Sequence, residues 1–104
     1  MLDKKTKQEI VKRIVSAENP KKIILFGSYA DGSPEEDSDI DLLVIKDKIE
    51  SKTELILKIR KAIRDIRMPK DIIVSYPAEF DFYKTEACSI YREAYEKGEV
   101  LYER

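Results

Sequence analysis

The feature that most constrains the fold is a polar segment, residues 27–41 (GSYADGSPEEDSDID), that lies between two apolar runs. The first run, KIILF at residues 22–26, is short and continuous, as in a strand buried on both faces. The second, DIDLLVIK at residues 39–46, is rich in aliphatic and β-branched residues that favour strands. The sequence therefore predicts two strands joined by a polar loop, with two aspartates where the second strand begins.

Three amphipathic helices and a third strand are predicted around this unit. Apolar residues recur at helical spacing over residues 3–17, 50–67 and 78–96, with charged residues on the other face. Residues 71–76 (DIIVSY) form the third strand, and the tail EVLYE suits a short edge strand or an extended packing segment. This alternation predicts a single α/β (α+β) domain over residues 1–104, a small mixed sheet with helices packed on one side. The helices are expected to stop at Asn19-Pro20, Met68-Pro69 and Gly98.

Composition excludes several kinds of site. The chain has no histidine and a single cysteine, Cys88, which rules out His-based catalysis, His–metal sites, internal disulfides and Cys-based zinc sites. Twenty basic against 21 acidic side chains leave a net charge of −1, which gives no support to sequence-independent nucleic-acid binding. The charged N-terminus and the lack of a long apolar run predict no signal peptide, no membrane contact and a cytoplasmic location. Acid–base or metal chemistry must therefore fall to carboxylates, with Lys, Tyr or Ser in support.

Asp39 and Asp41 are the first candidates for such chemistry. Residues two apart on a strand point to the same face, so the two carboxylates lie side by side while Leu42 faces the core. A divalent cation relieves their mutual repulsion, and Mg²⁺ is commonly held by one or two carboxylates together with substrate phosphates. An EF-hand is excluded, because counting from Asp37 the required glycine and glutamate positions hold Leu42 and Lys48. Taken alone, an Asp-x-Asp pair is also compatible with a solvated strand start.

Gly27 and Ser28 directly follow the first predicted strand. Glycine lets a phosphate approach the backbone closely, and the amide hydrogens after it, with the Ser28 hydroxyl, can face that phosphate. The pair is not a P-loop, because the Gly-Lys-Ser/Thr ending is missing. Alone, such a pair is more often an ordinary turn.

The combination is more specific than its parts. Gly27-Ser28, ten intervening residues and Asp39-x-Asp41, between two apolar strands, resemble the signature of the nucleotidyltransferase superfamily related to DNA polymerase β. The segment GSYADGSPEEDSDIDLLV is similar to the corresponding segment of the minimal nucleotidyltransferases (MNT), which are stand-alone domains of about this length. The order of strands and helices matches the family over nearly the whole chain. The resemblance implies ATP as substrate, Mg²⁺ in a two-ion site, and a third carboxylate on a neighbouring strand, where Asp71 stands.

The resemblance also implies a role for each candidate residue. Asp39 and Asp41 would hold Mg²⁺. Asp71 would bind the ion nearest the attacking group or take the proton of the incoming hydroxyl. Gly27 and Ser28 would orient the β- and γ-phosphates. AMP would then pass from ATP to an acceptor, with release of pyrophosphate.

The acceptor follows from the family's gene organisation. Stand-alone members are often encoded beside a HEPN-domain protein, as the antitoxin of a toxin–antitoxin pair. The resemblance therefore implies AMP transfer (AMPylation) to a tyrosine of a partner HEPN-type RNase. A second hypothesis is a non-catalytic binding module that neutralises its partner by contact. A third, nucleotidylation of a small molecule such as an aminoglycoside, would usually need an added acceptor-binding region, for which the sequence offers no candidate.

One position departs from the family pattern. The family loop commonly reads G-S-x-A-R-G, whereas Asp31 stands here in place of the arginine. An acid at this position removes a cation that would help to neutralise the triphosphate, an effect of several kcal/mol at about 4 Å and an effective dielectric constant near 20. Lys22, Lys46 or Lys48 are the sequence's candidates for a replacement cation.

Overall fold

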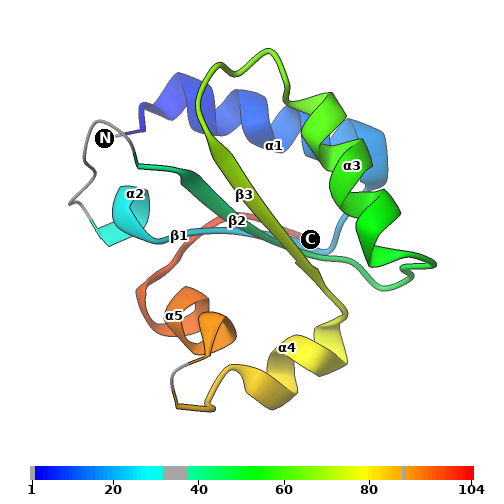
Figure 1. The fold of residues 1–104 in the computed structure, drawn as a ribbon, viewed down its shortest axis with the longest axis vertical. Helices are drawn as coiled ribbons and strands as arrows, with labels where there is room; N and C mark the ends of the chain where they lie inside the picture. The colour runs from blue at the N-terminus through cyan, green and yellow to red at the C-terminus, as the bar shows by residue number, and fades with distance from the viewer. Residues whose placement is uncertain (1, 32–37, 88) are drawn as a thin grey trace.

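The structure, a computed structural model, describes residues 2–31, 38–87 and 89–104. Each of the three predicted strands is present within one residue of its expected bounds, and of the two alternatives for the tail the structure shows the short edge strand. The elements in chain order (Figure 1) are α1 (Lys4–Glu18), β1 (Lys22–Phe26), α2 (Ser28–Asp31), β2 (Ile40–Ile45), α3 (Lys52–Ala62), β3 (Lys70–Ser75), α4 (Pro77–Tyr83), α5 (Ile90–Lys97) and β4 (Glu99–Glu103).

The four strands form one mixed sheet, as the sequence predicted, and their order in it is β3-β2-β1-β4. β1 is antiparallel to both β2 and β4, while β2 and β3 are parallel. Parallel neighbours need a crossover connection, and α3 supplies it. Because α3 returns along the strands, its C-terminal end lies at the sheet end where β2 and β3 begin.

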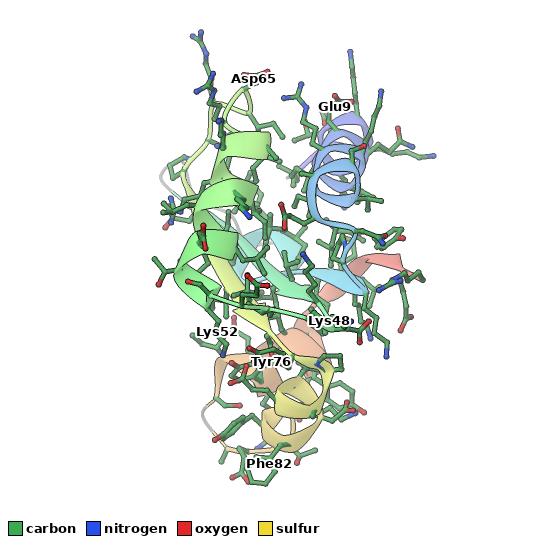
Figure 2. The ribbon with its side chains drawn as sticks, turned by 90° about the vertical axis from the view of Figure 1, so that its right-hand side faces the viewer. Glu9, Lys48, Lys52, Asp65, Tyr76 and Phe82 are labelled. Carbon is green, nitrogen blue, oxygen red and sulfur yellow. The ribbon has the colours of Figure 1, made fainter. Side chains whose placement is uncertain are left out.

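Helices cover both faces of the sheet, so the expectation that they pack on one side was wrong. α1 and α3 cover the first face, and α4 and α5 lie on the other side (Figures 1 and 2). The reason lies in β1 and β2, which are apolar at nearly every position and therefore need cover on both faces. The larger core cluster includes Ile10, Ile14, Ile23, Leu25, Leu42, Val44, Leu55, Ile59 and Ile63. The smaller cluster consists of Ile24, Phe26, Leu43, Ile45, Phe80 and Ala94.

Two predicted helices have different bounds in the structure. α3 ends at Ala62 rather than at the expected Met68-Pro69, although the apolar spacing continues. Ile63 is fully buried as the C-cap residue, and Ile66 donates its N–H to the Ile63 carbonyl within a tight turn. The apolar spacing therefore continues past the helix because Ile63 and Ile66, which lie in the turn, also pack against the core.

The helix predicted over residues 78–96 is two helices, α4 and α5. Ser89 separates them, because its hydroxyl accepts a hydrogen bond from the N–H of Arg92 at 3.0 Å and donates one to the carbonyl of Tyr83 at 3.0 Å. Such an N-cap starts a new helix in a new direction. The predicted stops at Asn19, which is left-handed with φ 46°, and at Gly98 are confirmed. No helix in the described part of the chain is long and apolar enough to cross a bilayer.

The first-face core should dominate stability. Ile59 of α3 is fully buried, whereas Leu57 on the same helix is 60% exposed. We expect Ile59→Ala to lower the free energy of unfolding by about 2 to 5 kcal/mol, a large part of the total for a domain of this size. Urea denaturation would measure this, with Leu57→Ala as the matched control, which should change stability by about 0.5 kcal/mol or less. Equal losses for both variants would contradict the packing described here.

Candidate active site

Three aspartates meet at the end of the sheet where β2 and β3 begin. Asp41, the second residue of β2, is paired in register with Asp71, the second residue of β3. Paired residues on adjacent strands share a face, and the strands lie about 4.8 Å apart, so these two carboxylates are neighbours. Asp39 is exposed just before β2 and close enough to raise the pKa of Asp41. All three predicted carboxylates are therefore brought to one place.

Gly27 lies directly against Asp41. Its φ is +76°, in the region that side-chain-bearing residues rarely adopt. A Cβ atom at this position would lie 2.1 Å from Oδ2 of Asp41. This closeness follows from the register, because Phe26, the residue before Gly27, is the antiparallel partner of Asp41. Backbone conformation and space therefore both require glycine here.

The carboxylates form a centre of uncompensated negative charge. Burial is the main cause that raises the pKa of Asp41 to about 6, and the charges of Asp71, Asp39 and Glu93 add to it. Among the residues that the structure describes, no ion pair involves any of these four carboxylates. The site thus gathers acids that repel one another and that a bound cation would stabilise.

The sequence that carries this site matches a known protein family. A family model described as "Polymerase beta, Nucleotidyltransferase" matches residues 8–104. A curated relative, the candidate protein adenylyltransferase MJ0604 of Methanocaldococcus jannaschii, is 39% identical in an alignment 87 residues long that covers 79% of this chain and 78% of the relative. The chain belongs to the polymerase β nucleotidyltransferase family. The expected resemblance is thereby confirmed, and the protein is a nucleotidyltransferase.

Solved structures show the same fold. The nucleotidyltransferase superposes on a chain from a toxin–antitoxin crystal structure with AMP-PNP at a TM-score of 0.65 and 22% identity, covering 94% of this chain and 73% of that one. It also matches a chain from the complex of a tri-AMPylated Shewanella oneidensis HEPN toxin with an MNT antitoxin, at a TM-score of 0.59 and 19% identity. That second match covers 99% of this chain and 74% of the other. The mixed sheet with its helices is therefore a nucleotidyltransferase fold.

The donor chemistry of the nucleotidyltransferase fits a hard divalent ion. Carboxylate oxygens are the ligands that Mg²⁺ prefers, and the set gathers Asp39, Asp41 and Asp71 around one strand end. Within the described residues, no group of three or more His, Cys, Asp or Glu side chains is already arranged to hold a metal ion. Mg²⁺ binding by these residues therefore stays a prediction, and it requires their carboxylates to turn toward one another.

Ser28 and Asp31 are less informative. Ser28 opens the short helix α2 and is half-buried, and the Ala30 N–H donates to the Gly27 carbonyl at 3.0 Å, so the chain turns sharply after β1. Phosphate binding by Gly27 and Ser28 stays a prediction. The side chain of Asp31 and residues 32–37 lie outside the described part of the chain.

Sequence reasoning missed Glu93. It lies on α5, which covers the same face of the sheet as Asp41, and its charge reaches that carboxylate. A residue so far along the chain belongs to no local motif. Only the packing of Ala94 into the smaller core cluster gives the orientation of α5. The acidic character of the site is thus greater than the motif alone indicated.

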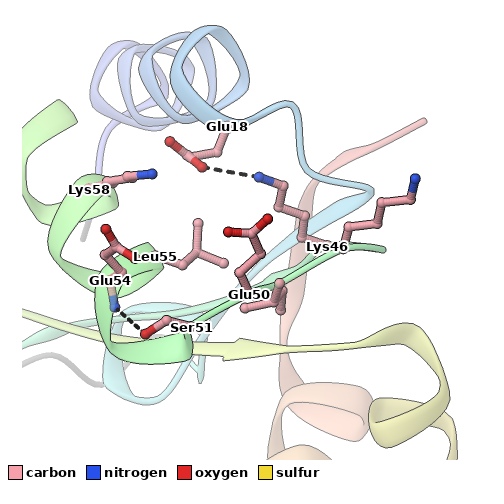
Figure 3. A pocket seen from close by; sticks show the side chains of 9 residues that line it. Glu18, Lys46, Glu50, Ser51, Glu54, Leu55 and Lys58 are labelled. Carbon is pink, nitrogen blue, oxygen red and sulfur yellow. Dashed lines mark hydrogen bonds and ion pairs between the residues drawn. The ribbon is translucent and has the colours of Figure 1, made fainter.

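The lysines proposed as replacement cations lie elsewhere. Lys22 is paired with Ile45 at the opposite end of β1, about 13 Å along the strands from Asp41. Lys46 follows β2 and pairs with Glu18 at 3.1 Å. Lys46 and Lys48 line a separate cavity of about 300 Å³ together with the start of α3 (Figure 3). None of these three lysines takes the place of the missing arginine.

The raised pKa of Asp41 makes stability depend on pH. A carboxyl whose folded pKa lies above its unfolded value of 3.8 stabilises the fold below pH 4, and that contribution is lost as pH rises through about 6. We therefore expect metal-free Asp41→Asn to gain about 1 to 2 kcal/mol over wild type at pH 7.5, after allowance for solvent screening of a partly accessible group. This advantage should vanish near pH 4 in urea denaturation. An advantage that does not change with pH would contradict the charge cluster.

Proposed function

We propose that this nucleotidyltransferase transfers AMP from ATP, with Mg²⁺, to a tyrosine of a partner HEPN-type RNase and thereby acts as its antitoxin. The carrying observation is the placement of Asp41 beside Asp71 in register and against Gly27. It offers two carboxylates next to a stretch of bare backbone, the combination that metal-assisted chemistry on a phosphate needs. The name of the curated relative, a protein adenylyltransferase, supports a protein as acceptor. The AMPylated HEPN toxin in a structure of the same fold supports the partner.

The chain's own residues carry the chemistry in distinct ways. Asp39 and Asp41 would hold Mg²⁺, which supplies positive charge where negative charge develops on the α-phosphate. Gly27, with no side chain, lets the triphosphate approach the backbone, and Ser28 offers a hydroxyl donor. Asp71, which no ion pair in the described part of the chain occupies, would bind a second ion or accept the proton of the attacking hydroxyl.

The reaction balances as a single displacement. The acceptor oxygen forms a bond to the α-phosphorus while the bond from that phosphorus to the bridging oxygen of the β-phosphate breaks. The hydroxyl proton leaves to a base, and pyrophosphate departs with the bonding electrons. AMP remains on the acceptor as a phosphodiester.

Label transfer tests the proposal. The purified chain is incubated with Mg²⁺, the HEPN-type RNase encoded beside its gene, and ATP labelled at the α-phosphate. We expect label on the RNase, loss of RNase activity, and pyrophosphate in an equal amount. ATP labelled at the γ-phosphate should leave the RNase unlabelled, since that phosphate departs in pyrophosphate. A lack of transfer with either Mg²⁺ or Mn²⁺ would overturn the proposal, and transfer to an aminoglycoside instead would assign a small-molecule acceptor.

A further inference from the structure

The outer face of α3 and the turn after it form an exposed basic surface with an apolar residue at one end. We define the basic α3 face as Leu57, Arg60, Lys61, Arg64 and Arg67, all of them exposed. It lies opposite the stripe through which α3 packs on the sheet. Leu57, at 60% exposure, is one of the most exposed large apolar side chains of the described residues. A leucine that contributes nothing to the core is a candidate contact for another molecule.

Positive charge is concentrated here against the trend of the chain. Residues 57–67 contain five basic side chains and one acid, a net charge of +4 in a chain of net −1. The acid, Asp65, is paired with Arg13 of α1 at 2.9 Å. In the described part of the chain, none of the four cations of the basic α3 face forms an ion pair. The face therefore presents four cations to whatever approaches it.

The crossover places this face at the reactive end of the sheet. Lys52 and Asp65 lie at opposite ends of the α3 segment (Figure 2), and the Asp65 end points toward the start of β3. The chain then returns to the sheet, where the N–H of Ile40 donates to the carbonyl of Pro69 at 2.8 Å. Ile40 stands between Asp39 and Asp41. Arg64 and Arg67 therefore lie at the same end of the sheet as the aspartates, but α3 covers the opposite face from the one on which Asp41 lies. A molecule held on them reaches the carboxylates only around the β3 edge of the sheet.

The occupant that best fits this surface is a protein. Residues 57–67 contain no aromatic side chain on which a nucleobase could stack. A nucleic-acid backbone that followed the surface from the basic α3 face around the β3 edge would meet the carboxylates, whereas a folded protein can place acids on the arginines and a neutral hydroxyl at the site. Arginine is also enriched at protein interfaces. An exposed leucine such as Leu57 can be buried there against an apolar side chain of the partner. We propose that the basic α3 face docks an acidic surface of the acceptor protein, with an apolar side chain over Leu57. This inference rests on the proposed function only in taking the acceptor to be a protein.

Peptide binding tests the surface without catalysis. The probe is a glutamate-rich peptide that contains leucines, added to the nucleotide-free and metal-free chain while backbone amide chemical shifts are followed. We expect the largest shifts at residues 57–67. Arg64→Glu with Arg67→Glu should weaken binding by about tenfold or more, and Leu57→Ala by a few-fold. The matched control, Lys4→Glu with Lys12→Glu on α1, makes the same charge change and should leave the affinity within about twofold.

Three results would overturn the inference. The first is equal weakening by both charge reversals, and the second is a set of shifts confined to the exposed aromatic residues of α4 and α5. The third is tighter binding of an oligouridylate of equal charge, which would assign a nucleic-acid surface.

Transfer kinetics separate this inference from the proposed function. With the RNase as acceptor, we expect Arg64→Glu with Arg67→Glu to raise the KM for the acceptor by about tenfold while kcat changes little. Transfer with an unchanged KM would refute the docking surface and leave the proposed function intact. A wild-type chain that binds the peptide on α3 but transfers no AMP would refute the proposed function and leave the docking surface intact.

Discussion

The double variant Asp39→Asn with Asp41→Asn should lose adenylyl transfer by about 10³-fold or more, equivalent to about 4 kcal/mol of transition-state stabilisation. Asparagine keeps the size of each side chain but removes the charges that would hold Mg²⁺ against the triphosphate. The fold should remain, because Asp39 is exposed and the Asp41 charge opposes folding rather than supporting it. The measurement is the initial rate of AMP transfer from α-labelled ATP, with urea denaturation to check that the variant is folded.

The control removes the same charge elsewhere. Asp47→Asn with Asp81→Asn alters two exposed aspartates, each of which pairs with a surface cation. It should leave the rate within about threefold, because exposed ion pairs contribute about 1 kcal/mol or less. A double variant at Asp39 and Asp41 that still transfers AMP would show that these carboxylates do not hold the metal. If it loses transfer but still silences the RNase, the chain neutralises its partner by contact alone.

Gly27→Ala should destabilise the fold by about 1 to 3 kcal/mol and reduce transfer by about 100-fold or more. The left-handed backbone disfavours any side chain, and the new Cβ atom would press on Oδ2 of Asp41. Since the carboxylate is the movable partner, the substitution shifts the group that the chemistry needs. Denaturant unfolding and initial transfer rates report the two effects separately.

Two comparisons sharpen this test. In an Asp41→Ala background the clash partner is gone, so Gly27→Ala should cost less stability than in wild type. Gly98→Ala is the matched glycine control, because the atoms nearest to a Cβ there belong to Ala94 and Ile24 rather than to an aspartate. It should lower stability while the rate of the folded enzyme is retained. If Gly27→Ala and Gly98→Ala lower the rate of transfer equally, the close packing of Gly27 on Asp41 does not contribute to catalysis.

The candidate site could be predicted from the sequence because its main parts lie close together in the chain. Gly27 and Asp41 flank one strand connection, and the period of two along β2 fixes which neighbours face the core. Asp71 was found through the family resemblance and then by its place at a strand start. Its register against Asp41 depends on how the crossover seats β3, and no local pattern encodes that.

The features that sequence reasoning missed depend on contacts between distant segments. The apolar run of β1 already implied cover on both faces, yet the helices were assigned to one side because spacing alone does not say where a helix docks. The split between α4 and α5 depends on the Ser89 cap, whose partners are known only once Tyr83 and Arg92 are in place. The expectation for Lys22 and Lys46 fails for a similar reason. Both lie close to the motif in sequence, but each stands at the end of its strand that is far from Asp41.

The register between β2 and β3 also separates reactivity from recognition. Asp41 and Asp71 are fixed relative to each other by a continuous ladder of backbone pairs from Ile40 to Ile45, whatever side chains the helices carry. The basic α3 face, in contrast, consists of side chains that the core does not use. Such a division lets the outer residues of one helix vary, and with them the choice of partner, while the spacing of the carboxylates stays constant. Under the proposed docking, substitutions on this surface would change the acceptor without moving the carboxylates.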